Sequence, residues 1–267
     1  MLDFSRAQVL ITGGSQGIGL ALASRFLQAG SRVLVTGRRT SALDEAQRAN
    51  PGLEIFENDI ADATRREALA AYVASSMPEL DVLINNAGFQ RRVPFAADDA
   101  DWSDRQSEID TLFSAPIHLT HLLIPRLISH GKPALIVNVT SGGAYVPQPF
   151  APVYSACKAA LHSVTVNLRF ALSRTCCRVV ELIPPAVQTG LGGTNLEHGA
   201  PLADFTDAVF AQLKAGTQDE IGYGFTASAP FQAAAEPYRE MFMQARARAS
   251  VRLYGDLNPG SDRENTQ

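Results

Sequence analysis

Short apolar runs alternate along the chain with longer stretches in which apolar residues recur every three or four positions. Short runs of this kind are typical of buried strands, and the periodic stretches are typical of helices that cover a sheet. Regular alternation of the two predicts an α/β fold, a doubly wound parallel sheet with helices on both faces. We expect the strands at residues 9–12, 32–36, 54–57, 82–85, 135–139, 178–183 and 220–223.

Stretches with helical periodicity separate many of these strands. The first ends before Gly30, a residue type that readily takes the left-handed conformation found just after helices. The longest contains Pro116, which has no N–H group to donate and is expected to bend the helix. We expect the helices at residues 18–29, 64–76, 102–129, 154–173 and 205–215.

The chain has 267 residues, 46% of them hydrophobic, which is enough to bury one large core. No linker and no internal repeat divides it. Residues 1–254 are therefore expected to form a single Rossmann-like domain. Residues 255–267 are polar and contain glycine and proline, so we expect a flexible C-terminal tail there.

Charge and cysteine content argue against several classes of protein. A net charge of −4 gives no reason to expect nucleic acid or an anionic membrane as a partner. No apolar stretch approaches the roughly 20 residues of a membrane span, and the N-terminus lacks the features of a signal peptide. Cys176 and Cys177 are adjacent, but small buried thiols are a commoner reason for such residues than a redox pair. Sparse cysteines favour a cytoplasmic location, and the five histidines show no metal-binding spacing, so no metal site is expected.

A glycine-rich loop between the first strand and the first helix is the first candidate binding motif in the sequence. Gly13, Gly17 and Gly19 allow a sharp turn and a close approach of the backbone to a pyrophosphate. The helix that follows offers free N–H groups and the positive end of its dipole to phosphates. The loop is a variant, in another spacing, of the dinucleotide-binding fingerprint.

Two further segments follow strands at the edge where a doubly wound sheet binds its ligand. Asn85, Asn86, Ala87 and Gly88 end the fourth strand, where small residues leave room for a nucleotide, although asparagine and glycine also favour an ordinary turn. Asp59 follows the third strand. It either hydrogen-bonds an adenine amino group or caps the next helix, and the sequence leaves both open.

Ser141, Tyr154 and Lys158 form the strongest candidate for catalysis. Tyr154 and Lys158 are four residues apart on a predicted helix, so their side chains share a face, and Ser141 follows the strand at residues 135–139. A tyrosine pKa of about 10 suits a base poorly near neutral pH. A neighbouring ammonium group and an oxidised nicotinamide are expected to lower that pKa. Tyr154 would then exchange a proton with a substrate oxygen held by Ser141 while hydride moves at carbon.

The end of the second strand bears on the choice between NAD and NADP. An acidic residue there would read the ribose 2′-hydroxyl of NAD, but the position holds Gly37, followed by Arg38. A guanidinium can pair with a 2′-phosphate. We therefore expect NADP(H) to be favoured over NAD(H). If Arg38 only covers the adenine, both cofactors remain usable.

Taken together, these motifs resemble the short-chain dehydrogenase/reductase family over nearly the whole chain. The segment from Leu182 to Thr189, together with Asp219–Ile221, is similar to the subgroup called DltE-like. The resemblance implies an enzyme acting on a carbonyl/alcohol pair, assembled as a homodimer or homotetramer. It also implies that residues 145–153 and 190–200 form the wall and lid of the substrate site, and their composition favours a small, apolar substrate.

The resemblance implies a specific set of site residues. Ser141, Tyr154 and Lys158 would be catalytic, with Lys158 also holding the nicotinamide ribose. The remaining cofactor-binding residues would be Gly13, Ser15, Gln16, Gly17, Ile18, Gly19, Arg38, Asp59, Ile60, Asn86, Ala87, Gly88, Pro184, Val187 and Thr189.

The sequence departs from the family pattern at Leu112, where the family has an asparagine that assists the proton relay behind the lysine. Pro185 replaces a family glycine. The first departure favours an alternative function, a non-catalytic or regulatory dinucleotide-binding protein, whereas the intact catalytic trio favours an enzyme. Arg91 and Arg92 either receive an anionic substrate or form a solvated charge pair.

Overall fold

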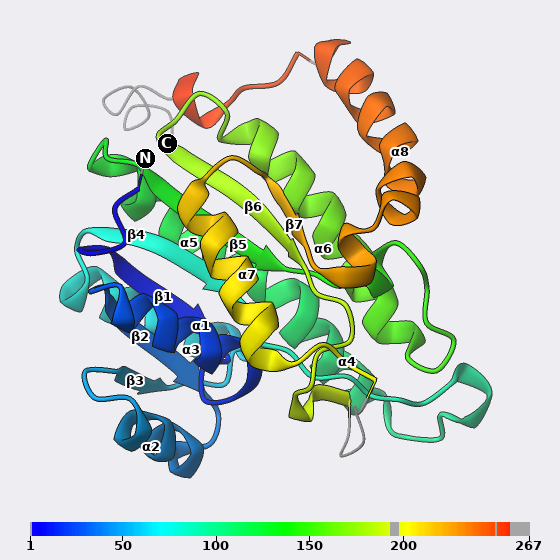
Figure 1. The fold of residues 1–267 in the computed structure, drawn as a ribbon, viewed down its shortest axis with the longest axis horizontal. Helices are drawn as coiled ribbons and strands as arrows, with labels where there is room; N and C mark the ends of the chain where they lie inside the picture. Colours follow the sequence, from blue (N-terminus) through cyan, green and yellow to red (C-terminus); the bar gives the residue numbers. More distant parts are fainter. Residues whose placement is uncertain (1, 193–197, 249, 257–267) are drawn as a thin grey trace, which may run out of the picture.

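The computed structural model describes residues 2–192, 198–248 and 250–256 and contains one parallel sheet of seven strands (Figure 1). Their order is β3-β2-β1-β4-β5-β6-β7. Each expected strand is present, with its ends within two residues of the prediction. The strands are β1 (Gln8–Thr12), β2 (Arg32–Gly37), β3 (Glu54–Glu57), β4 (Leu80–Asn85), β5 (Ala134–Val139), β6 (Cys177–Ile183) and β7 (Glu220–Gly222).

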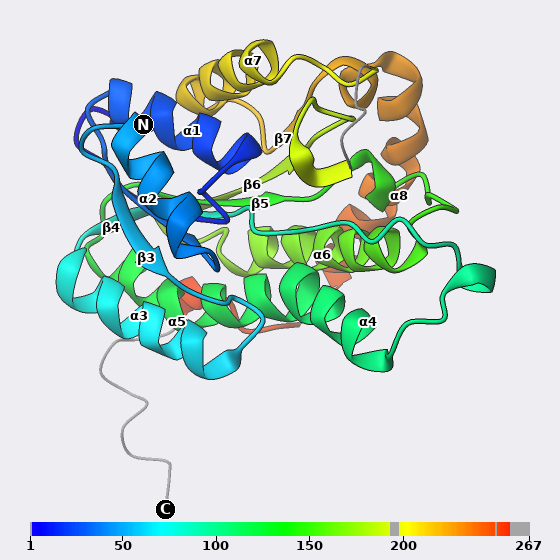
Figure 2. The ribbon, with the colours of Figure 1, turned by 90° about the horizontal axis from the view of Figure 1, so that it is seen from below.

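Helices cover both faces of the sheet, which confirms the doubly wound fold. In Figure 2, α1, α2 and α7 lie on one face, and α3, α4, α5 and α6 lie on the other. The helices are α1 (Gly17–Gln28), α2 (Thr40–Ala49), α3 (Ala63–Ser76), α4 (Trp102–Ile109), α5 (Ala115–Ser129), α6 (Pro152–Ala171), α7 (Leu202–Ala215) and α8 (Ala229–Arg248).

The alternation of side chains along each strand produces two separate cores. In β1, Val9 and Ile11 face the core that contains Phe26 of α1, whereas Leu10 faces the core that contains Leu123 of α5. Successive side chains of a strand point to opposite faces, so a strand buried on both sides must be apolar at every position. This requirement explains why the strands stand out so clearly in the sequence.

Two helices, α2 and α8, are not among the predicted elements. The polar helix α2 buries only Leu43 and Ala46, and α8 buries only Phe231 and Ala235, among the residues whose burial is described. With so few apolar positions, neither shows a clear helical period. Arg239 holds α8 to the sheet through Glu220 of β7, at 2.5 Å.

The long helix expected at residues 102–129 is interrupted before Pro116. A π-helical turn, Asp110–Ser114, separates α4 from α5. Pro116 lies in the first turn of α5 and has no N–H group to donate to the carbonyl of Leu112, four residues earlier. The predicted distortion is therefore present, but it lies in the turn that contains Leu112.

The C-terminal part of the described chain packs against the domain. Gly255 and Asp256, predicted to begin a flexible tail, lie in the 3-10 turn Tyr254–Asp256, and Asp256 pairs with Arg174 at 2.9 Å. Residues 257–267 lie outside the described part of the chain. Within the described ranges, no helix combines the length and apolar character that crossing a membrane requires. Cys177 begins β6 as a buried free thiol, and burial raises its pKa to about 12.

Candidate active site

The strands β1, β4, β5 and β6 end at one edge of the sheet, and a cavity of about 1070 Å³ opens there. The chain runs outward from β1 to β3 and then returns to place β4 on the other side of β1. Ligands of doubly wound sheets bind at such a reversal, outside the carboxyl ends of the strands. The cavity therefore lies where the fold predicts a nucleotide site.

The glycine loop forms one wall of this cavity and depends on its glycines for shape. Gly13 and Gly17 have φ angles of +64° and +57°, a region that side-chain-bearing residues rarely adopt. A Cβ atom at Gly13 would lie only 2.6 Å from the Cα atom of Ala87. The loop thus reaches the turn after β4 by direct backbone contact.

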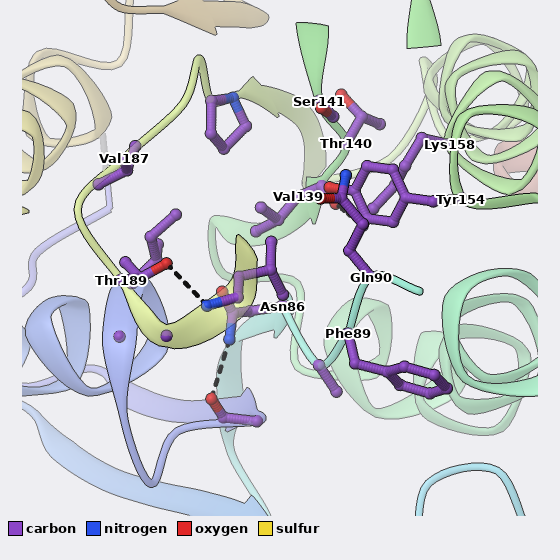
Figure 3. Close-up of a pocket in the computed structure, with 18 of the residues that line it drawn as sticks. Asn86, Phe89, Gln90, Val139, Thr140, Ser141, Tyr154, Lys158, Val187 and Thr189 are labelled. Carbon is purple, nitrogen blue, oxygen red and sulfur yellow. Dashed lines mark hydrogen bonds between the residues drawn. The ribbon is translucent and has the colours of Figure 1, made fainter. Parts of the chain in front are cut away.

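Asn86 fixes the relative positions of these two segments. Its side-chain Nδ2 donates to the carbonyl oxygens of Thr12 and Gly13, at 2.9 and 3.0 Å. In return, the Thr12 hydroxyl oxygen accepts the backbone N–H groups of Asn86 and Ala87, at 3.0 and 3.1 Å. The turn after β4 is therefore both a lining of the cavity and a brace for the glycine loop (Figure 3).

Most of the predicted cofactor-binding residues line the cavity, but Gly19 does not. A Cβ atom at Gly19 would lie 2.4 Å from Nδ2 of Asn86 and 2.5 Å from the carbonyl oxygen of Gly13. Its small size serves the packing of the loop against the brace. The predicted residues that line the cavity are Gly13, Ser15, Gln16, Gly17, Ile18, Arg38, Asp59, Ile60, Asn86, Ala87, Gly88, Ser141, Tyr154, Lys158, Pro184, Val187 and Thr189.

Two arginines border the cavity at the end of β2. The guanidinium carbon of Arg38 lies 5.7 Å from the ring centroid of Phe89, and Arg39 donates to the side chain of Gln16 at 2.8 Å. Both arginines are exposed. Arg38 alone was predicted to contact the cofactor, although Arg39 follows it directly in the sequence. Two cations thus stand where a nucleotide would place its adenosine end.

Asp59 lies near these arginines and is not the cap of the next helix. Its Oδ1 accepts the N–H of Ala61 at 3.1 Å and shapes the turn after β3. The N-cap of α3 is Asp62, whose carboxylate accepts the N–H groups of Thr64 and Arg65. Asp59 thus shapes this turn and lines the cavity, and its predicted contact with an adenine stays a prediction.

Tyr154, Lys158 and Ser141 meet on the opposite wall, all three buried (Figure 3). Nζ of Lys158 donates to the carbonyl oxygen of Val139 at 2.6 Å and lies 5.7 Å from the ring centroid of Tyr154. The Ser141 hydroxyl oxygen accepts the N–H of Gly143 at 3.0 Å, which leaves the hydroxyl hydrogen available to a ligand. The predicted trio is therefore assembled beside the cavity.

Burial controls the protonation of the pair. Burial raises the pKa of Tyr154 to about 12, against the opposite influence of the Ser141 hydroxyl, and lowers the pKa of Lys158 to about 8. The predicted lowering of the Tyr154 pKa required an oxidised nicotinamide as well as the lysine, and in the protein alone this pKa is raised. Desolvation of the charged form is the largest influence on each of the two pKa values. Near neutral pH, Tyr154 is a protonated donor beside an ammonium group.

A buried carboxylate that the sequence reasoning did not identify lies close to this trio. Glu108 of α4 accepts the N–H of Arg91 at 3.2 Å, and burial raises the pKa of Glu108. Its negative form would raise the pKa of Tyr154 as well. Its other oxygen, Oε2, has no hydrogen-bond partner among the described residues.

The two consecutive arginines after the β4 turn have different roles. Arg91 pairs with Asp98 at 2.8 Å, and Arg105 binds the same carboxylate at 2.9 Å, so Arg91 stabilises its own loop. Arg92 instead lines the cavity, with its guanidinium carbon 4.3 Å from the ring centroid of Phe150. Of the two, Arg92 lines the cavity and Arg91 does not.

Leu112 lies behind the trio, next to a second and much smaller cavity. This space of about 10 Å³ is bordered by Leu112, Thr111, Pro116 and Lys158, and its size is on the order of one water molecule. Because Pro116 donates no hydrogen bond to the Leu112 carbonyl, the π-helical turn has backbone acceptors outside the regular α-helical pattern. We expect backbone groups of this turn to hold a water in place of the missing asparagine.

Restoring an asparagine tests how much this departure costs. If delivery of the proton limits the rate, Leu112→Asn is expected to raise kcat by about fivefold, which corresponds to one hydrogen bond of roughly 1 kcal/mol. The solvent isotope effect on kcat should fall at the same time. Leu112→Met, of similar volume and without a hydrogen-bonding group, is the matched control. An unchanged rate and isotope effect in a folded Leu112→Asn protein would show that Leu112 is functionally silent.

Comparisons with known proteins agree with this geometry. The family model for short chain dehydrogenases matches residues 7–199. An uncharacterized oxidoreductase of Bacillus subtilis, DltE, is 44% identical over 217 residues, covering 79% of this chain and 86% of the relative. A sulfoacetaldehyde reductase of Chromohalobacter salexigens is 35% identical over 216 residues, covering 80% and 84%.

A solved structure gives the same result for the fold. The short chain dehydrogenase of Burkholderia cenocepacia, determined in complex with NADP, superimposes with a TM-score of 0.74 at 25% identity, covering 93% of this chain and 100% of that chain. The family match spans the glycine loop, the Asn86 brace and the predicted catalytic trio. The chain is therefore an oxidoreductase of the short-chain dehydrogenase/reductase family, of the DltE-like kind.

Proposed function

We propose that the protein interconverts a carbonyl and an alcohol with NADP(H), and that Tyr154 is the acid/base. The observation that carries this proposal is the placement of Ser141, Tyr154 and Lys158 on the cavity that the glycine loop also lines. The two parts of the reaction, binding of a dinucleotide and exchange of a proton, thus share one space.

A nicotinamide held in this cavity would supply or accept the hydride at the carbonyl carbon. In the reducing direction, the Ser141 hydroxyl donates a hydrogen bond to the carbonyl oxygen and orients it toward Tyr154. The Tyr154 hydroxyl then transfers its proton to that oxygen, which completes the alcohol. The raised pKa of Tyr154 keeps this proton in place at neutral pH, and the Lys158 ammonium stabilises the phenolate that forms.

The preference for NADP(H) rests on Arg38 and Arg39, with no acidic residue at the end of β2. In fluorescence titrations, NADPH is expected to bind more tightly than NADH by about 10- to 100-fold, as one charge-assisted hydrogen bond of roughly 1.5–3 kcal/mol implies. The Arg38→Ala/Arg39→Ala protein should lose this difference by weakening NADPH alone. Arg48→Ala, an exposed change elsewhere on α2, should preserve it. Equal or tighter binding of NADH to the unmodified protein would refute the preference.

The substrate end of the cavity has mainly apolar walls, and Arg92 also lines it. Phe89, Val146 and Phe150 line it, which supports the proposal of a small, apolar substrate. Arg92 favours a second candidate, a short carbonyl compound with an acidic group. The name of the sulfoacetaldehyde reductase relative, whose substrate is an aldehyde with a sulfonate, points the same way.

One assay separates these candidates and tests the activity itself. NADPH oxidation is followed across a panel of short aldehydes and ketones, each apolar compound matched with a sulfonate or carboxylate of similar length. Faster turnover of the neutral members would support the apolar substrate, and faster turnover of the acids would support a role for Arg92. Tight NADPH binding without turnover on any member would instead favour the non-catalytic, regulatory alternative.

Membership of the family supports two further proposals. We infer that the protein assembles as a homodimer or homotetramer and acts in the cytoplasm on a small molecule. Sedimentation analysis of the purified full chain measures its mass in solution, and a monomer at micromolar concentration would contradict the first of these.

A further inference from the structure

A buried carboxylate lies behind the wall of the cavity and is not used by the chemistry described above. Glu181, in the middle of β6, is fully buried and does not line the cavity. Its Oε1 accepts the Thr140 hydroxyl at 2.7 Å. Its Oε2 lies 2.8 Å from Nδ1 of His162 and accepts the Tyr145 hydroxyl at 3.3 Å.

The partners of Glu181 bracket the catalytic serine. Thr140 directly precedes Ser141, and Tyr145 follows it after the short 3-10 turn Gly142–Ala144. His162 belongs to α6, one helical turn beyond Lys158. A single carboxylate thus connects both ends of the serine segment to the helix that carries Tyr154 and Lys158.

This connection restricts the distance between the hydroxyl groups of Ser141 and Tyr154, on which the proposed proton transfer depends. Ser141 and Tyr154 lie on different elements, and their hydroxyl groups must address the same substrate oxygen. Hydrogen bonds on both sides of Ser141 restrict its segment, and the aromatic contact of Tyr145 with Phe231 of α8, 5.0 Å between ring centroids, restricts it further. Burial strengthens these bonds because no water competes for the carboxylate.

We propose that Glu181 and His162 form a charged pair that positions Ser141 opposite Tyr154 and so sets the rate of proton transfer. This proposal rests on the proposed carbonyl/alcohol activity. Glu181 and His162 are positioning residues, since neither lines the cavity.

The charge of the pair follows from its surroundings. Burial acts to lower the pKa of His162, but the hydrogen bond and the charge of Glu181 outweigh it, with a smaller contribution from Glu220, and the pKa is raised despite the opposing Arg169. Burial, together with Glu181 and Glu220, raises the pKa of Tyr145 against the influence of Arg239, so Tyr145 remains a donor. Glu220 is itself paired with Arg169 and Arg239.

The sign of the pH effect follows. Protonated His162 compensates the buried carboxylate up to a pH above the ordinary histidine pKa of about 6.5. Above the raised pKa, His162 loses its proton and leaves Glu181 as an unpaired buried charge, which is strongly unfavourable. The serine segment should then loosen, and kcat should fall on the alkaline side.

The first test compares Glu181→Gln with Glu54→Gln, a matched change of a carboxylate on the distant strand β3 that pairs with Arg32. Glu181→Gln is expected to lower kcat by about 10- to 100-fold, the loss that a displacement near 1 Å causes, with the Kd for NADPH within about twofold. The decrease of kcat attributed to His162 should disappear from its pH profile. Glu54→Gln should keep kcat within about twofold and retain that decrease.

A second pair of variants tests the proposal even if the Glu181→Gln protein does not fold. Thr140→Val removes the hydroxyl donor at nearly constant shape, whereas Thr140→Ser keeps it, and the serine protein should be the more active of the two. NMR titration of His162 measures the effect of Glu181 on the pKa of His162 and needs no turnover. In the Glu181→Gln protein, His162 should lose its proton at a lower pH.

Unaltered kcat and pH profile in a folded Glu181→Gln protein would overturn the proposal, as would an unchanged titration of His162. A failure of the proposed function is distinguishable, because the unmodified protein would then show no turnover before any variant is made.

Discussion

The Tyr154→Phe protein is expected to lose between about two and four orders of magnitude in kcat while binding NADPH as tightly as the unmodified protein. The change removes only the hydroxyl that delivers the proton and keeps the buried ring beside Lys158. Hydride transfer to a carbonyl would then leave an alkoxide with no adjacent acid. Steady-state kinetics on a substrate from the panel, with a parallel fluorescence titration, measure the two effects separately.

Tyr72→Phe is the matched control for this change. Tyr72 lies on α3, with its ring centroid 4.7 Å from that of Phe56, and its hydroxyl is outside the cavity. Its loss should leave kcat unaltered. A Tyr154→Phe protein that retains most of its turnover would remove Tyr154 from the role of acid/base.

The Lys158→Ala protein is expected to be impaired in both NADPH binding and proton transfer. We expect kcat/KM to fall by at least about 10³-fold, since proton transfer loses its supporting charge, and the Kd for NADPH to rise by roughly 10- to 100-fold with the loss of one charged donor. Lys132→Ala is the control, because Lys132 is an exposed lysine paired with Glu79. Tight NADPH binding by Lys158→Ala would limit the lysine to the chemical step.

The lowered pKa of Lys158 allows its role in NADPH binding to be tested a second way, by the pH dependence of binding. Burial lowers this pKa to about 8, so the ammonium discharges as the pH rises through that value in the free protein. A ligand held by the ammonium should therefore bind more weakly above a pH of about 8. The Kd for NADPH measured from pH 6 to pH 10 should show this loss in the unmodified protein, and the loss should be absent in Lys158→Ala.

The parts of the fold that could be predicted from the sequence are those that local pattern determines. Strands such as β5 are apolar at nearly every position because both faces are buried, and the glycine loop stands out because positive φ angles demand glycine. Helix α8 escaped prediction because it buries little and is held mainly by polar contacts, such as that of Arg239 with Glu220. Such contacts have no sequence period.

The candidate site shows the same division. Ser141, Tyr154 and Lys158 could be predicted from the sequence, because their residue types and their spacing are both visible there. The rise in the pKa of Tyr154 in the protein alone was not predicted, because the extent of its burial depends on elements distant in sequence. Glu181 was overlooked, although an acidic residue inside the apolar strand Cys177–Ile183 was a signal that something buried must compensate it.

The brace between Thr12 and Asn86 also bears on the order of folding. These residues are 74 positions apart, and between them the chain must complete β2, β3 and the helices that connect them. Contacts of such separation form late, since the entropy of closing the loop opposes them until the intervening elements are packed. The nucleotide cavity therefore exists only when β4 has been inserted beside β1. A nucleotide bound there would stabilise the assembled sheet and not its partly folded precursors, so it would act as a selective ligand for the completed fold.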